Sequence, residues 1–153
     1  MKRLIIIIPV YNEEDIIEKV IKTLLSNIKN ARWKVSLNML VVNDGSSDNT
    51  KKILEKLRCN QLHLPSNLGI GGAVQAGFKF AKKYNYDYAV QFDGDGQHNF
   101  SEIGKLIKKM CETGHDFVIG SRLIEKDYDY DFPIERKIGI YFSRKILSLT
   151  KAP

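Results

Sequence analysis

Short apolar runs alternate with longer segments of helical period along this chain. The runs are rich in Ile, Val, Leu and aromatic residues, whereas apolar positions in the longer segments recur every three or four residues. This alternation predicts an α/β fold, with a mostly parallel central sheet flanked by crossover helices. We expect strands at 4–10, 35–42, 61–64, 86–92 and 116–122, and helices at 13–28, from about 48, within 67–84, from 101, and at 134–149. Asn12 is a candidate cap of the first helix, and Ser101 or Asn99 is a candidate cap of the helix from 101.

Length and composition agree with one globular domain over residues 1–153. A chain of this size buries roughly two thirds of the surface that it exposes when unfolded, and 43% hydrophobic with 27% charged residues is ordinary for such a domain. The two cysteines, Cys59 and Cys111, are far apart and form no CxxC pair, which argues against a disulfide framework or a zinc site and favours the cytoplasm. No run of eighteen apolar residues occurs, so no transmembrane helix is expected.

The net charge of +6 is moderate and does not call for a nucleic-acid partner. It is concentrated near the end of the chain, where a predicted amphipathic helix at 134–149 carries Arg136, Lys137 and Arg144. Such a helix is consistent with packing on the core through its apolar stripe. The alternative is peripheral contact with an anionic membrane surface.

Polar residues follow the predicted strands at their carboxyl ends, in the stretches PVYNE, NDGSSD, DGDGQH and GSR. Ligands of open parallel sheets bind beyond the carboxyl ends of the strands. We therefore expect these four stretches to gather at one edge and to form the functional site.

Asp93 and Asp95 are the most informative of these residues, because two carboxylates so close together repel each other unless a cation is bound. With Gln97 they offer the hard oxygen ligands that Mg2+ or Mn2+ prefers. Gly94 allows a tight turn and the close approach of a bulky ligand. The alternative is a solvated turn, since Asp and Gly are common turn residues; His98 is either a further ligand or exposed to solvent.

Two more stretches carry competing interpretations. Asp44 precedes a glycine at the ligand edge, where it could accept hydrogen bonds from a base or ribose, while Ser47 and Asp48 are best explained as caps of the next helix. The glycine-rich stretch 67–77 lacks the third glycine of a dinucleotide fingerprint, since Val74 stands there. Close backbone packing, with or without amides that face a phosphate, explains it better.

Taken together, IIPVYNEE, VVNDGSSDNT, NLGIGGAVQAG, DGDGQH and GSR resemble, in this order, the nucleotide-sugar-binding half of family 2 glycosyltransferases of the GT-A fold. Within that family they resemble the dolichol-phosphate mannosyltransferase and polyprenyl-phosphate glycosyltransferase branch. The resemblance covers nearly the whole chain. Members usually continue past residue 153 with an acceptor-binding segment, so it also implies a domain truncated at its C-terminus.

The resemblance implies a role for each matching residue. Asp93 and Asp95 would bind the metal ion and the diphosphate, with Gln97 beside them, and Asp95 and Arg122 would serve catalysis near the sugar phosphate. The implied nucleotide-sugar-binding residues are Pro9, Tyr11, Glu13, Asp44, Asp93 and Gly94.

The implied activity is inverting, metal-dependent transfer of a sugar from a UDP- or GDP-linked donor to a polyprenyl phosphate or a sugar acceptor, at the inner face of the membrane. A lipid phosphate is already anionic and needs no general base, whereas a sugar hydroxyl would need one. The alternative is a non-catalytic nucleotide-sugar-binding module that a partner segment completes. A nucleotidyltransferase would want a glycine-rich, basic loop after the first strand, where this chain has the acidic PVYNEED.

Overall fold

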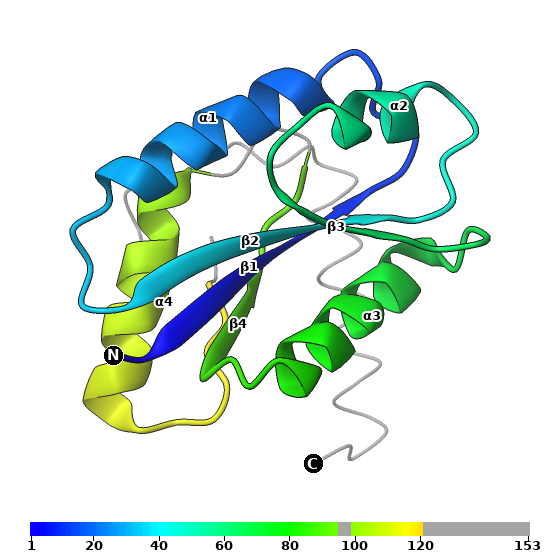
Figure 1. Ribbon diagram of the computed structural model, residues 1–153. Helices are drawn as coiled ribbons and strands as arrows, with labels where there is room; N and C mark the ends of the chain where they lie inside the picture. The colour runs from blue at the N-terminus through cyan, green and yellow to red at the C-terminus, as the bar shows by residue number, and fades with distance from the viewer. Residues whose placement is uncertain (95–98, 121–153) are drawn as a thin grey trace, which may run out of the picture. The chain divides into compact units, whose positions relative to one another are not determined.

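The computed structural model describes residues 1–94 and 99–120, which form a parallel sheet with helices on both faces (Figure 1). The predicted α/β class is confirmed, with four strands in the order β3-β2-β1-β4 over the described residues. The strands are β1 (Arg3–Val10), β2 (Ser36–Asn43), β3 (Asn60–His63) and β4 (Tyr88–Gln91). The helices are α1 (Ile17–Asn30), α2 (Thr50–Glu55), α3 (Gly69–Lys83) and α4 (Phe100–Thr113).

The chain divides into two compact units, residues 1–118 and 119–153. All the helices and strands named above lie in the first unit, and only residues 119 and 120 of the second are described. The single domain expected from length stays a prediction, and the C-terminal helix expected at 134–149 lies outside the described residues.

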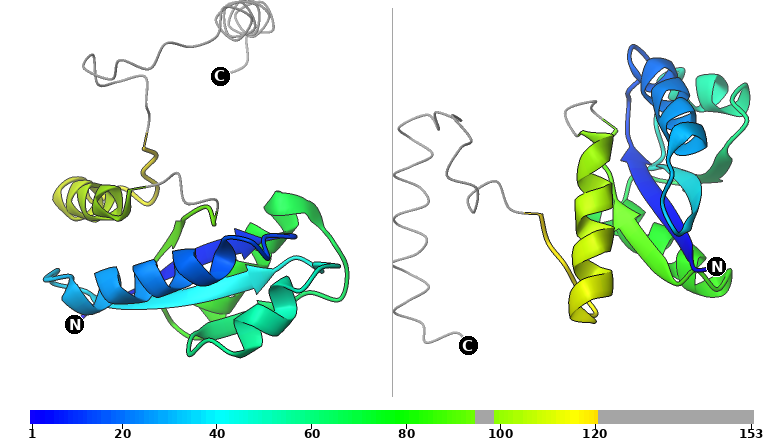
Figure 2. Two further views of the ribbon diagram at one scale, coloured as in Figure 1. Left: turned by 90° about the horizontal axis from the view of Figure 1, so that it is seen from above. Right: turned by 90° about the vertical axis from the view of Figure 1, so that its left-hand side faces the viewer.

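β1 lies at the centre of the sheet, and its side chains from Ile5 to Ile8 are fully buried. Because successive side chains of a strand point to opposite faces, β1 supplies both halves of the core. Leu4, Ile6 and Ile8 pack with residues of α1, α2 and α4, whereas Ile5 and Ile7 pack with α3. The sheet is therefore covered on both sides (Figure 2), which explains why β1 is apolar at nearly every position.

The register of the strands places the functional edge. β1 and β2 pair without a break from Arg3 opposite Ser36 to Val10 opposite Asn43, and β3 ends with His63 opposite Asn43. The chains that leave β1, β2 and β3 therefore start at the same level of the sheet, on the right in Figure 1.

Two sequence predictions about helix ends need correction, and one is confirmed. α1 begins at Ile17 rather than at residue 13, although the amide of Ile17 already bonds to Glu13 O at 2.9 Å. Asn12 does not cap it. Its backbone has a positive φ of 54°, and its side-chain oxygen accepts a hydrogen bond from Ser47 N in the next loop. Asn99 does cap α4, since its side chain accepts from Ser101 N at 3.0 Å.

The strand expected at 116–122 does not form over its described part. Residues 116–120 have no strand pairing, and the ring of Phe117 is 75% exposed. An apolar run shows that a segment favours burial but does not identify its partner, which is why the prediction fails here. Within residues 1–94 and 99–120, no helix combines the length and apolarity that crossing a bilayer requires.

The contact between α3 and β1 gives a test of this packing. A Cβ at Gly77 would lie 2.4 Å from Ile7 Cγ2, whereas a Cβ at Gly71 of the same helix would meet nothing within 4 Å. We expect Gly77→Ala to lower the free energy of unfolding by about 1–3 kcal/mol, because the buried core must shift. Gly71→Ala should leave it unchanged or raise it by up to about 1 kcal/mol. Urea unfolding followed by circular dichroism measures both; equal effects would contradict the close α3–β1 packing.

Candidate functional site

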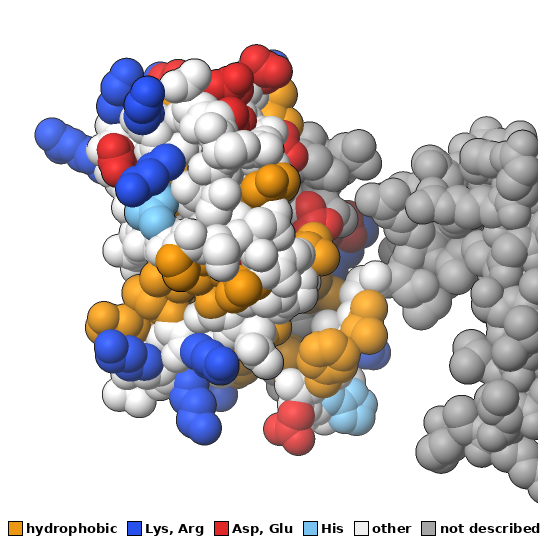
Figure 3. All heavy atoms as spheres, turned by 90° about the vertical axis from the view of Figure 1, so that its right-hand side faces the viewer, with side chains coloured by type: hydrophobic (Ala, Val, Ile, Leu, Met, Phe, Trp, Pro, Cys, Tyr) orange, Lys and Arg blue, Asp and Glu red, His pale blue; other side chains and the backbone are white. Residues whose placement is uncertain are grey.

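A hollow of about 270 Å³ opens at the carboxyl ends of β1, β2 and β4. The six predicted nucleotide-sugar-binding residues all lie in its wall, although their roles stay predictions. The described lining residues are Pro9, Val10, Tyr11, Glu13, Asp44, Ile70, Ala73, Asp93 and Gly94. Viewed from the side on which these strands end, acidic side chains gather at the top of the surface and hydrophobic ones form a band below its centre (Figure 3).

Asp44 is fixed by the neighbouring strand β1 and by the segment before α3. Its amide donates to Val10 O at 2.9 Å, and its Oδ1 accepts from Leu68 N at 2.8 Å. The residue is only 3% exposed and still lines the hollow. One carboxylate oxygen thus has a structural task, which the sequence did not predict.

Gly45 lets this loop lie directly on the chain that precedes α3. Its φ is +68°, and a Cβ there would lie 2.6 Å from the carbonyl carbon of Ser66 and 2.7 Å from Asn67 N. Both the backbone conformation and the space therefore require glycine. The consequence is that β2's loop and the start of α3 approach each other backbone to backbone beside the hollow.

The loops after β1 and β2 exchange hydrogen bonds in both directions. Three amides of the first loop donate to the second: Asn12 N to Ser46 Oγ at 3.0 Å, Glu13 N to Thr50 Oγ1 at 2.9 Å and Glu14 N to Asp48 Oδ2 at 3.2 Å. In return, Asn12 Oδ1 accepts from Ser47 N at 2.9 Å and Glu14 Oε2 from Asn49 N at 2.9 Å. Each loop supplies the partners that the other's free amides need.

These contacts revise the capping roles predicted for Ser47 and Asp48. Neither is the N-cap of α2, which is Asn49. Ser47 donates to Asn12, whereas Asp48, one residue before the N-cap, accepts from Thr50 N at 2.9 Å. Burial acts to raise the pKa of Asp48, but hydrogen bonds from the side chain and amide of Thr50 and from the amide of Glu14 outweigh it and hold the pKa below its usual value.

Asp93 and Gly94 bring the end of β4 to the hollow. Asp93 Oδ1 accepts from Gln91 Nε2 at 2.8 Å. Gly94 is buried, and a Cβ there would lie 3.0 Å from Val10 Cγ1, so glycine permits close packing on β1 as well as the approach of a ligand.

The remaining predicted metal and catalytic residues, Asp95, Gln97 and Arg122, lie outside the described residues, as does His98. In the part of the chain that the structure describes, no three His, Cys, Asp or Glu side chains come together as a metal site. The metal site therefore stays a prediction that joins Asp93 to residues beyond the described ranges.

Several residues of the site were missed by sequence reasoning. Val10 and Ile70 line the hollow, and Ile70 is 62% exposed although apolar. For the glycine-rich stretch, close packing is confirmed at Gly77, while Ala73 both packs and lines the hollow. Asn43 was also missed; its signal is a polar residue at the end of a buried strand, where it is only 2% exposed.

Comparison with known proteins agrees with this site. The model of the family described as "Glycosyl transferase family 2" matches residues 5–152, so the chain belongs to that family, whose members are glycosyltransferases. It is 33% identical over 155 residues to the UDP-N-acetylglucosamine–dolichyl-phosphate N-acetylglucosaminyltransferase of Methanococcus voltae, a match covering 90% of this chain and 59% of the relative. It is 30% identical to the polyprenol monophosphomannose synthase of Mycolicibacterium smegmatis, over 90% of this chain and 51% of the relative.

A solved structure shows the same fold. The match to S. aureus TarS 1-349 in complex with UDP-GlcNAc has a TM-score of 0.56 at 26% identity, and it covers 73% of this chain and 32% of the TarS 1-349 chain. The chain thus spans only part of the proteins that it matches, between 51% and 59% of the two curated relatives above.

Thr50 offers a test of the exchange between the two loops. It is fully buried, and Thr50→Val removes the oxygen that accepts from Glu13 N. The bond is part-buried, so its loss should lower the free energy of unfolding by roughly 1–2 kcal/mol. Thr23→Val is the matched control on the exposed face of α1, where the hydroxyl donates only to Lys19 O of its own helix. Urea unfolding compares the two, and a loss no larger than that of the control would show that the loops do not depend on this bond.

Proposed function

We propose that this chain supplies the donor site of a glycosyltransferase that moves a sugar from a nucleotide diphosphate sugar to a polyprenyl phosphate. One observation carries the proposal: six residues from the ends of three strands, far apart in sequence, line a single hollow. The printed names of two relatives, which pair a sugar with dolichyl phosphate or polyprenol phosphate, support the acceptor class. The neighbour that holds UDP-GlcNAc supports a nucleotide-sugar donor.

The lining suits the parts of such a donor. Pro9, Val10 and Ile70 are apolar and Tyr11 is an exposed aromatic ring, a set that favours contact with a flat base. The carboxylates of Glu13 and Asp44 would accept hydrogen bonds from ribose hydroxyls or from the N–H of a base. UDP and GDP are both compatible with this arrangement.

The charge of the lining favours a divalent cation. Among its described residues are three carboxylates, Glu13, Asp44 and Asp93, and no Lys or Arg. A diphosphate would be repelled there unless a cation accompanied it. Asp93, Asp95 and Gln97 would hold Mg2+ or Mn2+ through oxygen atoms, and the ion, when bound, supplies positive charge against the charge that grows on the leaving diphosphate.

The acceptor would attack the anomeric carbon from the face opposite the nucleotide, so the configuration at that carbon inverts. A polyprenyl phosphate brings an oxygen that is already anionic, which is consistent with a donor site without a dedicated general base. Arg122 is proposed to lie near the sugar phosphate, where a fixed cation would stabilise the developing charge.

We place the reaction at the cytoplasmic side of a membrane, because a lipid phosphate is reached only there by a protein that also binds a nucleotide sugar from the cytosol. The basic residues of the last part of the chain would contribute peripheral contact with anionic lipid. A second candidate function is a non-catalytic nucleotide-sugar-binding module. In such a module a partner segment would complete the acceptor site, and a test for sugar transfer to a polyprenyl phosphate distinguishes it from the enzyme.

Calorimetric titration of the chain tests the donor site. UDP-N-acetylglucosamine, UDP-glucose and GDP-mannose would each be added with Mn2+ and with EDTA, and we expect one of them to bind in a metal-dependent way. Asp95→Ala should weaken that binding by at least roughly tenfold without unfolding the chain, because a metal ligand is lost. Glu112→Ala is the control, since this carboxylate lies on the exposed surface of α4.

Each contrary result has its own meaning. Binding of equal strength in EDTA would remove the metal from the proposal. Unfolding of Asp95→Ala would show that Asp95 belongs to a structural network rather than to a metal site. No binding of any nucleotide sugar would contradict a donor site made by this chain.

A further inference from the structure

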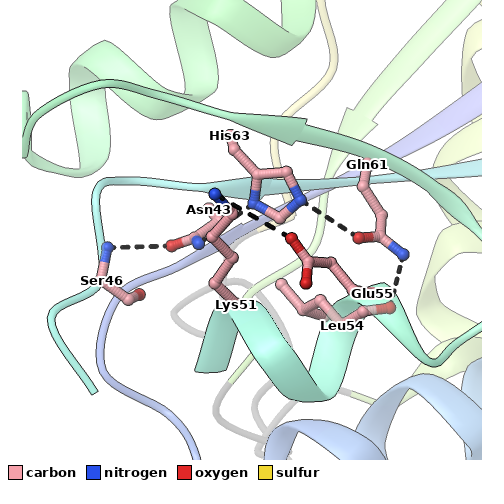
Figure 4. Close-up of polar contacts among 7 residues, drawn as sticks. All are labelled: Asn43, Ser46, Lys51, Leu54, Glu55, Gln61 and His63. Atoms are coloured by element: carbon pink, nitrogen blue, oxygen red, sulfur yellow. Dashed lines mark hydrogen bonds and ion pairs between the residues drawn. The ribbon is translucent and has the colours of Figure 1, made fainter. Parts of the chain in front are cut away.

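A chain of hydrogen bonds outside the hollow reaches the loop that carries Asp44 (Figure 4). It starts at the buried side chain of Asn43, the last residue of β2, which bonds in two directions. Asn43 Oδ1 accepts from Ser46 N at 3.0 Å, and Asn43 Nδ2 lies 3.2 Å from His63 Nδ1. The side chain thus links the β2–α2 loop to the end of the neighbouring strand β3.

The direction of these bonds selects one tautomer of the neutral His63 ring. An amide nitrogen only donates, so Nδ1 of the imidazole must accept and its proton must be on Nε2. Nε2 lies 3.2 Å from Gln61 Oε1, an acceptor, and Gln61 Nε2 in turn donates to the carbonyls of Leu54 and Leu57 at the end of α2. Every donor meets an acceptor only when the ring is neutral.

We propose that His63 in this neutral form, together with Asn43, is a positioning residue for the donor site. The proposal rests on the proposed function, because the site that it positions is the one that would bind the nucleotide sugar. Asn43 holds Ser46 N, and Ser46 Oγ accepts from Asn12 N at 3.0 Å. The chain of bonds from His63 therefore fixes the loops on both sides of the hollow, next to Asp44 and next to Tyr11.

Protonation of His63 would break this chain of bonds. An imidazolium carries a proton on both nitrogens, so Nδ1–H would face the amino group of Asn43, a donor facing a donor. If the amide of Asn43 turned over, its amino group would face Ser46 N instead, and the same conflict would arise there. One bond of the chain is lost in either case: either Asn43 loses its link to β3, or Ser46 N loses its link to Asn43.

The charged groups around the ring do not settle its protonation. Lys51 and Glu55 of α2, which pair at 3.9 Å and are both more than half exposed, are drawn in the same close-up (Figure 4). Glu55 favours the imidazolium and Lys51 opposes it, and Asp44 adds a carboxylate next to Asn43 in the chain. The two protonation states of the ring therefore differ in the bond to Asn43, and a pH titration of the chain follows that difference.

Nuclear magnetic resonance of the ligand-free chain tests the geometry first. The 15N shifts of the ring should report a proton on Nε2 and none on Nδ1, and the Ser46 amide should shift in parallel with the titration of the ring. In His63→Asn the side-chain oxygen still accepts from Asn43 but does not titrate, so the Ser46 shift should disappear. A proton on Nδ1 of the neutral ring, or a Ser46 amide that ignores the titration, would overturn the proposal.

Binding of the nucleotide sugar tests the consequence. Between about pH 8 and about pH 5.5 the affinity of the wild-type chain should fall by roughly two- to tenfold, the worth of one hydrogen bond. A nucleotide sugar is a better probe for this titration than a nucleoside diphosphate, because the diphosphate of a nucleotide sugar has no proton that titrates in this pH range. His63→Asn should bind with little dependence on pH, whereas His115→Asn, at an exposed position after α4, should behave like the wild type.

A second variant makes the prediction sharper. In Asn43→Asp the carboxylate accepts both from Ser46 N and from a protonated ring, so the affinity should no longer fall in mild acid, whatever its absolute level. A pH dependence that survives unchanged in His63→Asn would have another source, such as His98, and would overturn the proposal. If the wild type bound no nucleotide sugar at any pH, the proposed function would fail, and the ring and amide signals alone would decide whether His63 holds the loop.

Discussion

The in-register parallel pairing of β1 with β2 is the constraint on which the site depends. Because the two strands end at the same level, Val10 opposite Asn43, their following loops start side by side. The amide of Asp44 extends this alignment by one bond to Val10 O. A slip of one residue would turn every side chain of β1 to the other face, so the buried isoleucines that hold the core also hold the functional edge in register.

The loops at this edge solve a problem of unsatisfied backbone groups. Backbone amides just beyond the end of a parallel sheet no longer have a hydrogen-bond partner on the neighbouring strand. In a solvated loop they would hydrogen-bond to water instead. Here the side chains of one loop accept from the amides of the other, with Thr50 fully buried between them. The hollow therefore has walls of fixed geometry, although part of its lining belongs to loops, and the three carboxylates that line it are held in place by the fold.

Sequence patterns predicted the features that depend on local chemistry. The apolar runs gave β1 and the class of fold, and the strand-end position of Asp44 and Asp93 placed them at one edge. The patterns could not show that Asn12 serves the neighbouring loop instead of its own helix, because a capping residue and a cross-loop residue have the same polar side chain. They also failed for 116–120, where burial depends on a partner that no local pattern identifies, and for Asn43 and His63, which meet only through the pairing of β2 with β3.

The arrangement of the hollow separates the two halves of the proposed reaction. Its described lining comes from residues 9 to 94, on the end of β1, on α3 and on the loops beside them, which the sheet and the core already hold. Recognition of a nucleotide sugar would thus rest on residues that the sheet holds, while Asp95, Gln97 and Arg122, which would act on the diphosphate and the sugar, follow them in sequence. A donor site of this kind would form before an acceptor is engaged, which is the order that an enzyme needs if the acceptor is to attack a sugar already oriented by its nucleotide.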